Sequence, residues 1–238
     1  MQQKQKDTAL VWFGNNLRTK DNVSLKKAIS DHSKVIALYC FNPDHFKKDK
    51  FGFKKTEKFR AKFLIESIHD LRINLEGLNI TLLTFHDYPK SCIPKICDAY
   101  NVSDIYLQKE WTREEIHTLT KVKSELSNVE FHEDYDQFLY HPKTVSKNFD
   151  NIPNVFTPFR KKLEKYVDIL EEETVESLSA NNKIDEETNI PSLQKLGFEN
   201  FSASSKTAFP FMGGESKGLT RLHYYLFESK KASYYKKT

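Results

Sequence analysis

The order of apolar runs along this chain is the feature that most constrains its fold. From Thr8 onward, short apolar runs alternate with longer stretches in which apolar residues recur at helical spacing. This alternation is typical of βαβ units, which build a parallel sheet. The short runs are rich in Val, Ile, Leu, Phe and Tyr, as strands buried on both faces should be. We therefore predict an α/β fold with a five-stranded, doubly wound parallel sheet, whose strands span residues 9–13, 35–41, 80–85, 105–108 and 129–133.

Two of the helical stretches between these strands carry a clear apolar stripe. The longer one covers residues 55–76, and its stripe consists of Leu64, Ile68, Leu71 and Leu75. The later one opens with Thr112 and Glu115, which predict a capping box at its start. Its stripe consists of Ile116, Leu119, Val122 and Leu126. We expect both stripes to face the sheet.

The pattern changes after residue 136, so we assign residues 1–136 to a first domain. A connection over residues 137–206 is dotted with Pro and Asn and contains a basic amphipathic helix over residues 157–170. Its remainder, residues 171–206, is acidic and then rich in Ser and Asn. We predict an irregular linker there that lies across the surface of the first domain.

A third segment, residues 207–238, contains a helical pattern from residue 215 to the end. The pattern reaches Thr238 without a cap or a helix-breaking residue, and we therefore expect the sequence to be cut there. Aromatic and lysine residues crowd this stretch. They would suit the stacking of bases or of an isoalloxazine ring, or equally the exposed edge of a missing domain.

Composition excludes several classes of protein. The 7 glycines form neither G-x-G-x-x-G nor G-x-x-x-x-G-K-[ST], which excludes the common glycine-rich nucleotide sites. The 3 cysteines are sparse and contain no C-x-x-C, so we expect a reducing, cytoplasmic location. The net charge of +4 carries no argument for nucleic acid by itself. The chain starts with polar residues and contains no run of 18 apolar residues, so we expect neither an export signal nor a membrane-spanning helix.

Polar side chains follow every predicted strand. In an open parallel sheet, ligands bind beyond the carboxyl ends of the strands, where the strand order reverses. The residues at those ends are Gly14, Asn15, Asn16, Asn42, Pro43, Asp44, His86, Asp87, Lys109, Glu110, Asp134, Tyr135 and Asp136. Hydrogen-bond acceptors dominate, which favours a polar heteroaromatic ligand with N–H groups over a phosphate.

Each of these residues also has a purely structural interpretation. The Asn and Asp residues are common turn formers that bond their own backbone. Glu110 precedes a predicted helix start at Thr112, where an anion is stabilised by about 0.3–1 kcal/mol. His86, His132 and His141 are scattered and lack a second ligand at metal-binding spacing, so we predict no metal site.

Several motifs, in one order along the chain, give a more specific result. Residues 12–18 read W-F-G-N-N-L-R and are followed by Asp21, Asn22 and Leu25. They resemble W-F-R-N-D-L-R-x-x-D-N-x-x-L, the opening motif of the photolyase/cryptochrome superfamily. Similarity to its DASH-type cryptochromes lies in F-G-F-K-K-T (51–56), F-R-A (59–61), L-Y-H-P (139–142), P-N-V-F-T-P-F-R-K (153–161), F-M-G-G-E (211–215) and Y-K-K-T (235–238).

This resemblance implies a Rossmann-like antenna domain, a linker, and the first helix of a helical FAD-binding domain. It implies a monomeric blue-light flavoprotein, a deoxyribodipyrimidine photolyase or photoreceptor, that repairs cyclobutane pyrimidine dimers in single-stranded DNA or signals. DNA and most of the FAD pocket would belong to further helical residues, so we expect no catalytic residue, flavin colour or repair in chain 1–238.

The resemblance also implies cofactor contacts. The family's antenna chromophore is 5,10-methenyltetrahydrofolate, and the segment Q-K-E-W-T-R-E-E at 108–115 is similar to the one whose glutamate holds the pterin ring. That residue would be Glu110, with Lys109 beside it, and Tyr235 would be the first FAD contact. Part of the folate site lies in the helical domain in such proteins.

Two residues differ from the family's opening motif. Gly14 stands where the family has Arg and Asn16 where it has Asp, so a charge pair is absent. This absence implies either a reshaped, weaker chromophore site or drift in a compensated pair.

The alternative function is that of a freestanding α/β nucleotide-binding or interaction module without flavin. A reading frame that continues past Thr238 would favour the flavoprotein, and a stop codon would favour the module. Acid–base catalysis at the sheet edge is disfavoured, because no suitable residue spacing stands out.

Overall fold

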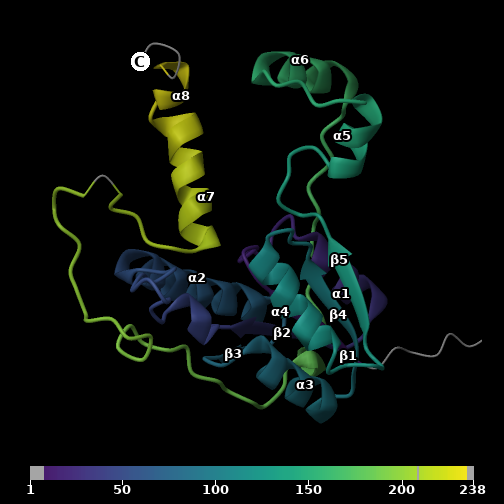
Figure 1. The fold of residues 1–238 in the computed structure, drawn as a ribbon, viewed down its shortest axis with the longest axis vertical. Helices are drawn as coiled ribbons and strands as arrows, with labels where there is room; N and C mark the ends of the chain where they lie inside the picture. The colour runs from purple at the N-terminus through teal and green to yellow at the C-terminus, as the bar shows by residue number, and fades with distance from the viewer. Residues whose placement is uncertain (1–7, 208, 235–238) are drawn as a thin grey trace, which may run out of the picture.

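A parallel sheet with helices on both faces forms the body of the protein in the computed structural model, which describes residues 8–207 and 209–234 (Figure 1). Its strands are β1 (Thr8–Phe13), β2 (Val35–Cys40), β3 (Leu82–Phe85), β4 (Val102–Gln108) and β5 (Glu130–Asp134). They lie in the order β3-β2-β1-β4-β5, and every neighbouring pair is parallel. The predicted α/β class and five-stranded sheet are thus confirmed.

The alternation of side chains along β1 shows why helices cover both faces. Ala9, Val11 and Phe13 are buried against α1 (Val23–Asp31) and α2 (Lys58–Gly77). Leu10 points the other way, into a core shared with α3 (Pro89–Ala99) and α4 (Arg113–Lys123). The sheet is therefore doubly wound, as predicted, and the strand order reverses between β1 and β4.

Strand boundaries differ from the predicted ones by one to three residues. β4 begins at residue 102 instead of 105, because Asp104, only 2% exposed, accepts a 2.7 Å hydrogen bond from His132 of β5. β2 ends at Cys40 instead of 41, β3 begins at 82 instead of 80, and β5 lies one residue later than predicted.

Two predicted helix starts also need correction. The helix predicted from residue 55 begins at Lys58, because residues before it form a loop closed by an antiparallel bridge between Lys48 and Lys54. Thr112 does stand at the N-cap of α4, but its side chain makes no capping hydrogen bond. The capping box is therefore wrong, and Glu115 instead lines a cavity described below.

Beyond β5 the chain leaves the body and forms a first arm, α5 (Pro142–Asn148) and α6 (Phe156–Tyr166). α5 was not predicted. α6 ends four residues before the predicted limit of 170, because its continuation meets no apolar surface: Ile169 and Leu170 are 59% and 76% exposed.

The linker over residues 171–206 is irregular and lies on the body, as predicted, with one 3-10 turn, η2 (Ala180–Asn182). Asn182 anchors it. The buried Asn182 amide accepts from Val35 N at 2.8 Å and donates to Val35 O at 3.0 Å and to Asn79 O at 2.7 Å. Farther along, Leu196 and Phe198 enter the core.

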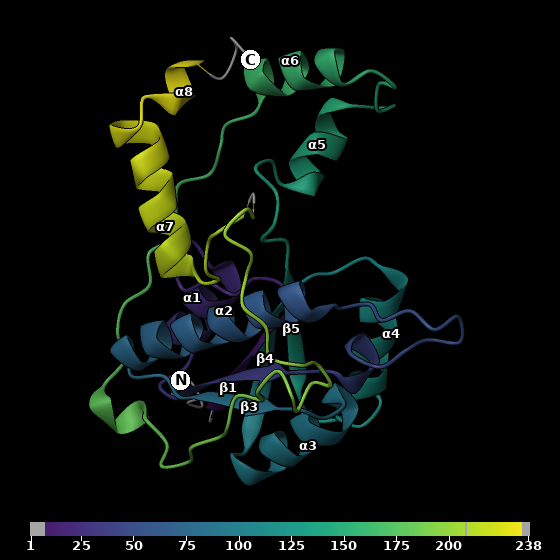
Figure 2. The ribbon, with the colours of Figure 1, turned by 90° about the vertical axis from the view of Figure 1, so that its left-hand side faces the viewer.

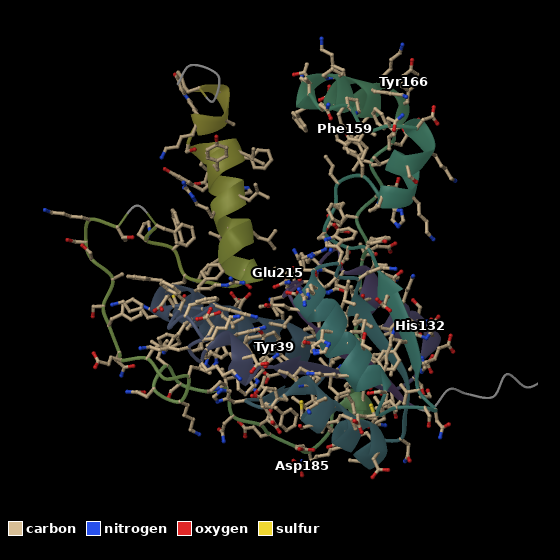
Figure 3. The ribbon with its side chains drawn as sticks, viewed as in Figure 1. Tyr39, His132, Phe159, Tyr166, Asp185 and Glu215 are labelled. Carbon is tan, nitrogen blue, oxygen red and sulfur yellow. The ribbon has the colours of Figure 1, made fainter. Side chains whose placement is uncertain are left out.

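The chain then forms a second arm, α7 (Glu215–His223), the π-helical turn η3 (Tyr224–Glu228) and α8 (Lys231–Tyr234), which rises from the same side of the body as the first (Figure 2). The predicted continuous helix is interrupted at Lys230, whose φ is +55°. Glu215 fixes the foot of α7 (Figure 3), since its carboxylate accepts 2.9 Å bonds from Thr19 N and Lys20 N. None of the described helices combines the length and apolar composition needed to cross a bilayer.

Candidate functional site

A cavity of about 680 Å³ lies at the carboxyl edge of the sheet. The residues after β1 and β4 border it, and these are the strands between which the strand order reverses. Side chains from α2 and α4 complete its lining. The position is the one at which doubly wound sheets bind ligands, and the volume is typical of small-molecule pockets.

Glu110 joins the two border strands. Its Oε1 atom accepts a 2.7 Å hydrogen bond from Gln108 Nε2, at the end of β4, and a 3.2 Å bond from Asn15 Nδ2, just after β1. Among the described residues, no hydrogen bond to its Oε2 atom is recorded. The carboxylate is therefore held in place through one oxygen, while the other keeps its acceptor capacity.

Only part of the predicted ring of strand-end residues borders the cavity. Gly14, Asn15, Asn42, Asp44 and Glu110 do. The lining does not include Pro43, Asn16, His86, Asp87, Asp134, Tyr135 or Asp136.

Several of these side chains serve the local structure, as turn formers do. Asn42 Oδ1 accepts from Asp44 N at 3.0 Å, and Asp87 Oδ1 accepts from Tyr88 N at 2.7 Å. Asp136 pairs with Arg18 at 3.1 Å, and burial raises the pKa of its carboxyl group.

Of the other two predicted cofactor contacts, only Lys109 lies within the described residues, and it does not border the cavity. Lys109 is the chain neighbour of Glu110, yet the Lys109 ammonium lies 5.3 Å from the ring centre of Tyr135 and is not part of the lining. Tyr235 lies outside the described residues. Glu110 is therefore the predicted contact that the structure brings to the cavity.

Sequence reasoning missed the residues that reach the cavity from outside the strands. His45 comes from the 3-10 turn η1 (Pro43–His45), and burial, followed by the charge of Lys55, lowers its pKa below 6.5. Glu115 comes from α4 and has a buried Oε2 atom without a hydrogen-bond partner in the described part of the chain. Proximity to the end of β2 could have indicated His45, whereas no sequence signal separates Glu115 from a surface glutamate.

Four aromatic side chains belong to the apolar part of the lining: Trp12, Phe13, Tyr39 and Phe63. Burial raises the pKa of the Tyr39 phenol, so this group stays neutral and can donate a hydrogen bond. Flat rings beside fixed acceptors suit a planar heteroaromatic ligand that carries N–H donors.

The structure also shows what replaces the absent charge pair after β1. Asn16 is 2% exposed, and its Oδ1 atom accepts from Gly14 N at 3.2 Å, which closes the turn. Asn16 Nδ2 is buried and has no recorded partner among the residues that the structure describes. A neutral hydrogen bond thus stands where the family has a charge pair, and Gly14 borders the cavity without a side chain.

A second group of polar residues lies at the opposite end of the sheet. Candidate ligand atoms of Asp104, Glu130 and His132 fall within 4.8 Å of one another, a grouping that the sequence analysis did not predict. The Asp104–His132 hydrogen bond and the stacking of His132 on Tyr106, with ring centres 4.4 Å apart, account for this arrangement as packing.

Comparisons with known proteins agree with this geometry. The family model of DNA photolyase matches residues 9–179. A cryptochrome DASH of Gloeobacter violaceus is 34% identical over 97% of this chain and 47% of its own length. The blue-light photoreceptor PHR2 of Arabidopsis thaliana is 31% identical over 90% of this chain and 49% of its own length. The chain thus spans about half the length of these relatives.

Solved structures show the same fold. The cryptochrome of Synechocystis sp. matches with a TM-score of 0.87 and 30% identity, over 97% of this chain and 48% of that one. An archaeal photolyase from Sulfolobus tokodaii, crystallised with two FAD molecules that imply a novel light-harvesting cofactor, matches with a TM-score of 0.72 over 91% of this chain and 46% of its own. At 23% identity the second match supports the fold alone.

Proposed function

Because the chain belongs to the DNA photolyase family, we propose that its α/β body is the antenna portion of a blue-light flavoprotein of the cryptochrome DASH type. Its task in this proposal is to bind 5,10-methenyltetrahydrofolate at the carboxyl edge of the sheet. When bound, the folate would absorb light and pass the excitation energy to FAD.

The position of Glu110 is the observation that carries this proposal. A pterin ring presents a 2-amino-pyrimidinone edge, on which an amino group and a ring N–H point in nearly the same direction. A carboxylate is the matching acceptor, and such charge-assisted bonds are worth about 1.5–3 kcal/mol. Gln108 and Asn15 orient Glu110 through Oε1, so Oε2 would accept from one of the two ligand donors, and the other would have to compete with Asn15 for Oε1.

The rest of the lining fits the same ligand. Trp12 and Phe63 provide apolar surface for a flat ring. The lowered pKa of His45 keeps its imidazole neutral at pH 7, so that it adds no positive charge to the cavity. Glu115 offers a second buried acceptor, which a ligand donor would satisfy.

The activity of the whole protein follows as a wider proposal. We divide the chain into residues 1–136, 137–206 and 207–238, and assign FAD binding to a helical domain that begins in the last of these. Light-driven repair of pyrimidine dimers in single-stranded DNA, or signalling, would take place on that domain. Catalytic residues would lie there too, and Tyr235 would contact FAD. We place the protein in the cytoplasm, since its cysteines are all free thiols.

Titration of 5,10-methenyltetrahydrofolate against the full-length protein tests the proposal, because part of the folate site would lie in the helical domain. Glu110→Gln keeps the size of the side chain but replaces one acceptor by a donor that faces a donor. We expect folate affinity to fall about 10- to 100-fold, since each 1.4 kcal/mol is a factor of ten.

The matched control is Glu125→Gln, an exposed glutamate just after α4 that does not border the cavity. This variant should bind folate like the unchanged full-length protein. Unaltered affinity in full-length Glu110→Gln, or no folate binding by the unchanged full-length protein, would contradict the proposal and leave Glu110 its role beside the start of α4.

A further inference from the structure

The segment that leads into α2 displays aromatic rings and positive charge where the proposed antenna site has no use for them. We define the FGF loop as residues 48–54, which the bridge between Lys48 and Lys54 closes. At its tip Phe51 and Phe53 are 71% and 72% exposed. In Figure 2 this segment extends from the start of α2, beyond the body and beside α4.

The loop holds these two rings in a defined conformation. The Asp49 carboxylate accepts hydrogen bonds from Phe51 N at 2.8 Å and from Phe53 N at 3.0 Å. Asp49 N in turn donates to Phe53 O at 2.8 Å. Gly52, with a φ of +87°, allows the tight turn between the two rings. The loop is therefore ordered by its own hydrogen bonds, without burying the apolar residues that it carries.

The charge around the loop has one sign. Residues 47–62 contain eight cationic side chains and two carboxylates, Asp49 and Glu57. The Asp49 carboxylate is engaged by the loop's own backbone. Five of the cations form no ion pair with any other described residue: Lys48, Lys50, Lys54, Lys58 and Arg60.

Cations and rings also alternate on the neighbouring surface. Lys50 Nζ lies 5.0 Å from the ring centre of Phe51. Lys58 Nζ lies 5.4 Å from the ring centre of Phe59, which is 63% exposed, and Phe59 packs edge-on against Phe201 at 4.8 Å. The FGF loop thus continues into a strip in which aromatic faces and ammonium groups are interleaved.

We propose that this surface binds single-stranded nucleic acid. Exposed rings provide faces on which unpaired bases stack, and ammonium groups that form no ion pair with another described residue, such as those of Lys48 and Lys50, would bind the phosphates. Paired bases would not offer their faces, so a duplex fits poorly. A protein groove that buried both rings would have to bury the adjacent lysines as well, which favours a polyanion as the partner. This site differs from the DNA site assigned above to a helical domain, because it needs neither flavin, light nor a lesion.

Fluorescence anisotropy in the dark tests this inference with chain 1–238 and labelled, undamaged oligothymidylate of about 12 nucleotides, a length within the usual range of single-strand sites. Phe51→Ala/Phe53→Ala should weaken binding about 10- to 100-fold. Oligouridylate in a second arm distinguishes RNA from DNA, and either polymer satisfies the proposal. A duplex of the same length should bind much more weakly.

Salt dependence reports on the lysines separately. Lys48→Gln/Lys50→Gln should reduce the slope of log K against log salt by about 1.4, since each phosphate contact with a single strand contributes about 0.7. Lys90→Gln/Lys95→Gln, on exposed positions of α3, is the matched control and should leave the slope unchanged.

Two further variants make the outcome decisive. Phe227→Ala removes a ring that is 73% exposed on the second arm and should change affinity less than twofold. Glu110→Gln should leave oligonucleotide binding intact, so failure of the folate site and failure of this one are distinguishable. No binding by the unchanged chain, an unaffected Phe51→Ala/Phe53→Ala variant, or a larger effect of Phe227→Ala would each overturn the proposal. Circular dichroism verifies that the variants stay folded.

Discussion

The body and the two arms carry similar apolar stripes, yet only the body covers them. In α2, the stripe residues Ile68, Leu71 and Leu75 are fully buried against the sheet. In α6 only Leu163 is buried, and α7 buries no residue at all. An amphipathic period therefore reveals that a helix has an apolar face, but not what that face meets.

The difference also shows in how each part is held. Two apolar cores, one on each face of the sheet, stabilise the body. The second arm is attached at its foot by polar contacts of Glu215 and by the close approach of Gly213, where a Cβ atom would lie 2.2 Å from Phe63 O. We expect stability to be concentrated in the sheet, with the arms opening at lower cost.

The largest expected effect compares the same substitution in the two parts. Leu38→Ala removes a fully buried side chain in β2 and should lower the free energy of unfolding by about 2–5 kcal/mol. Leu222→Ala, at a position that is 51% exposed in α7, should change it by less than about 0.5 kcal/mol. Urea unfolding measures both values. Equal losses would mean that the arm is packed as firmly as the sheet.

A medium effect is expected where the linker meets the body. Asn182→Ala leaves the backbone groups of Val35 and Asn79 without partners, and we expect a loss of about 1–3 kcal/mol in urea unfolding. The neighbouring Asn181 is exposed, so Asn181→Ala is the matched control and should be close to neutral. A neutral Asn182→Ala would show that the linker merely lies on the body.

The smallest effect concerns the pH dependence of the body. Because the pKa of His45 is lowered on folding, the unfolded chain binds more protons between the folded pKa and 6.5. Stability therefore rises with pH through that window and is fully gained above 6.5. The rise between about pH 5 and 7 should be shallower in His45→Gln, as urea unfolding at several pH values would measure. An identical slope would show that burial does not hold this imidazole neutral.

Hydrogen-bond patterns explain which boundaries and contacts the sequence could not reveal. Asp104 looked like the residue before a strand, but His132, 28 positions away, pairs with it and lets β4 start earlier. Thr112 had the right type and spacing for a cap, yet Glu115 is directed to the cavity. In the first case a partner distant in the chain decided the outcome, and in the second the cavity at the sheet edge did.

The sequence by itself determined the class of fold, the parallel sheet and the edge at which a ligand site would lie. These follow from alternating periods and from chain direction, which are local properties. The tertiary structure alone decided that Asn15 and Gln108 orient Glu110 while Lys109 turns toward Tyr135, and that His45 and Glu115 complete the cavity. The reason is physical: direction and burial of a side chain depend on neighbours that the chain brings together only when it folds.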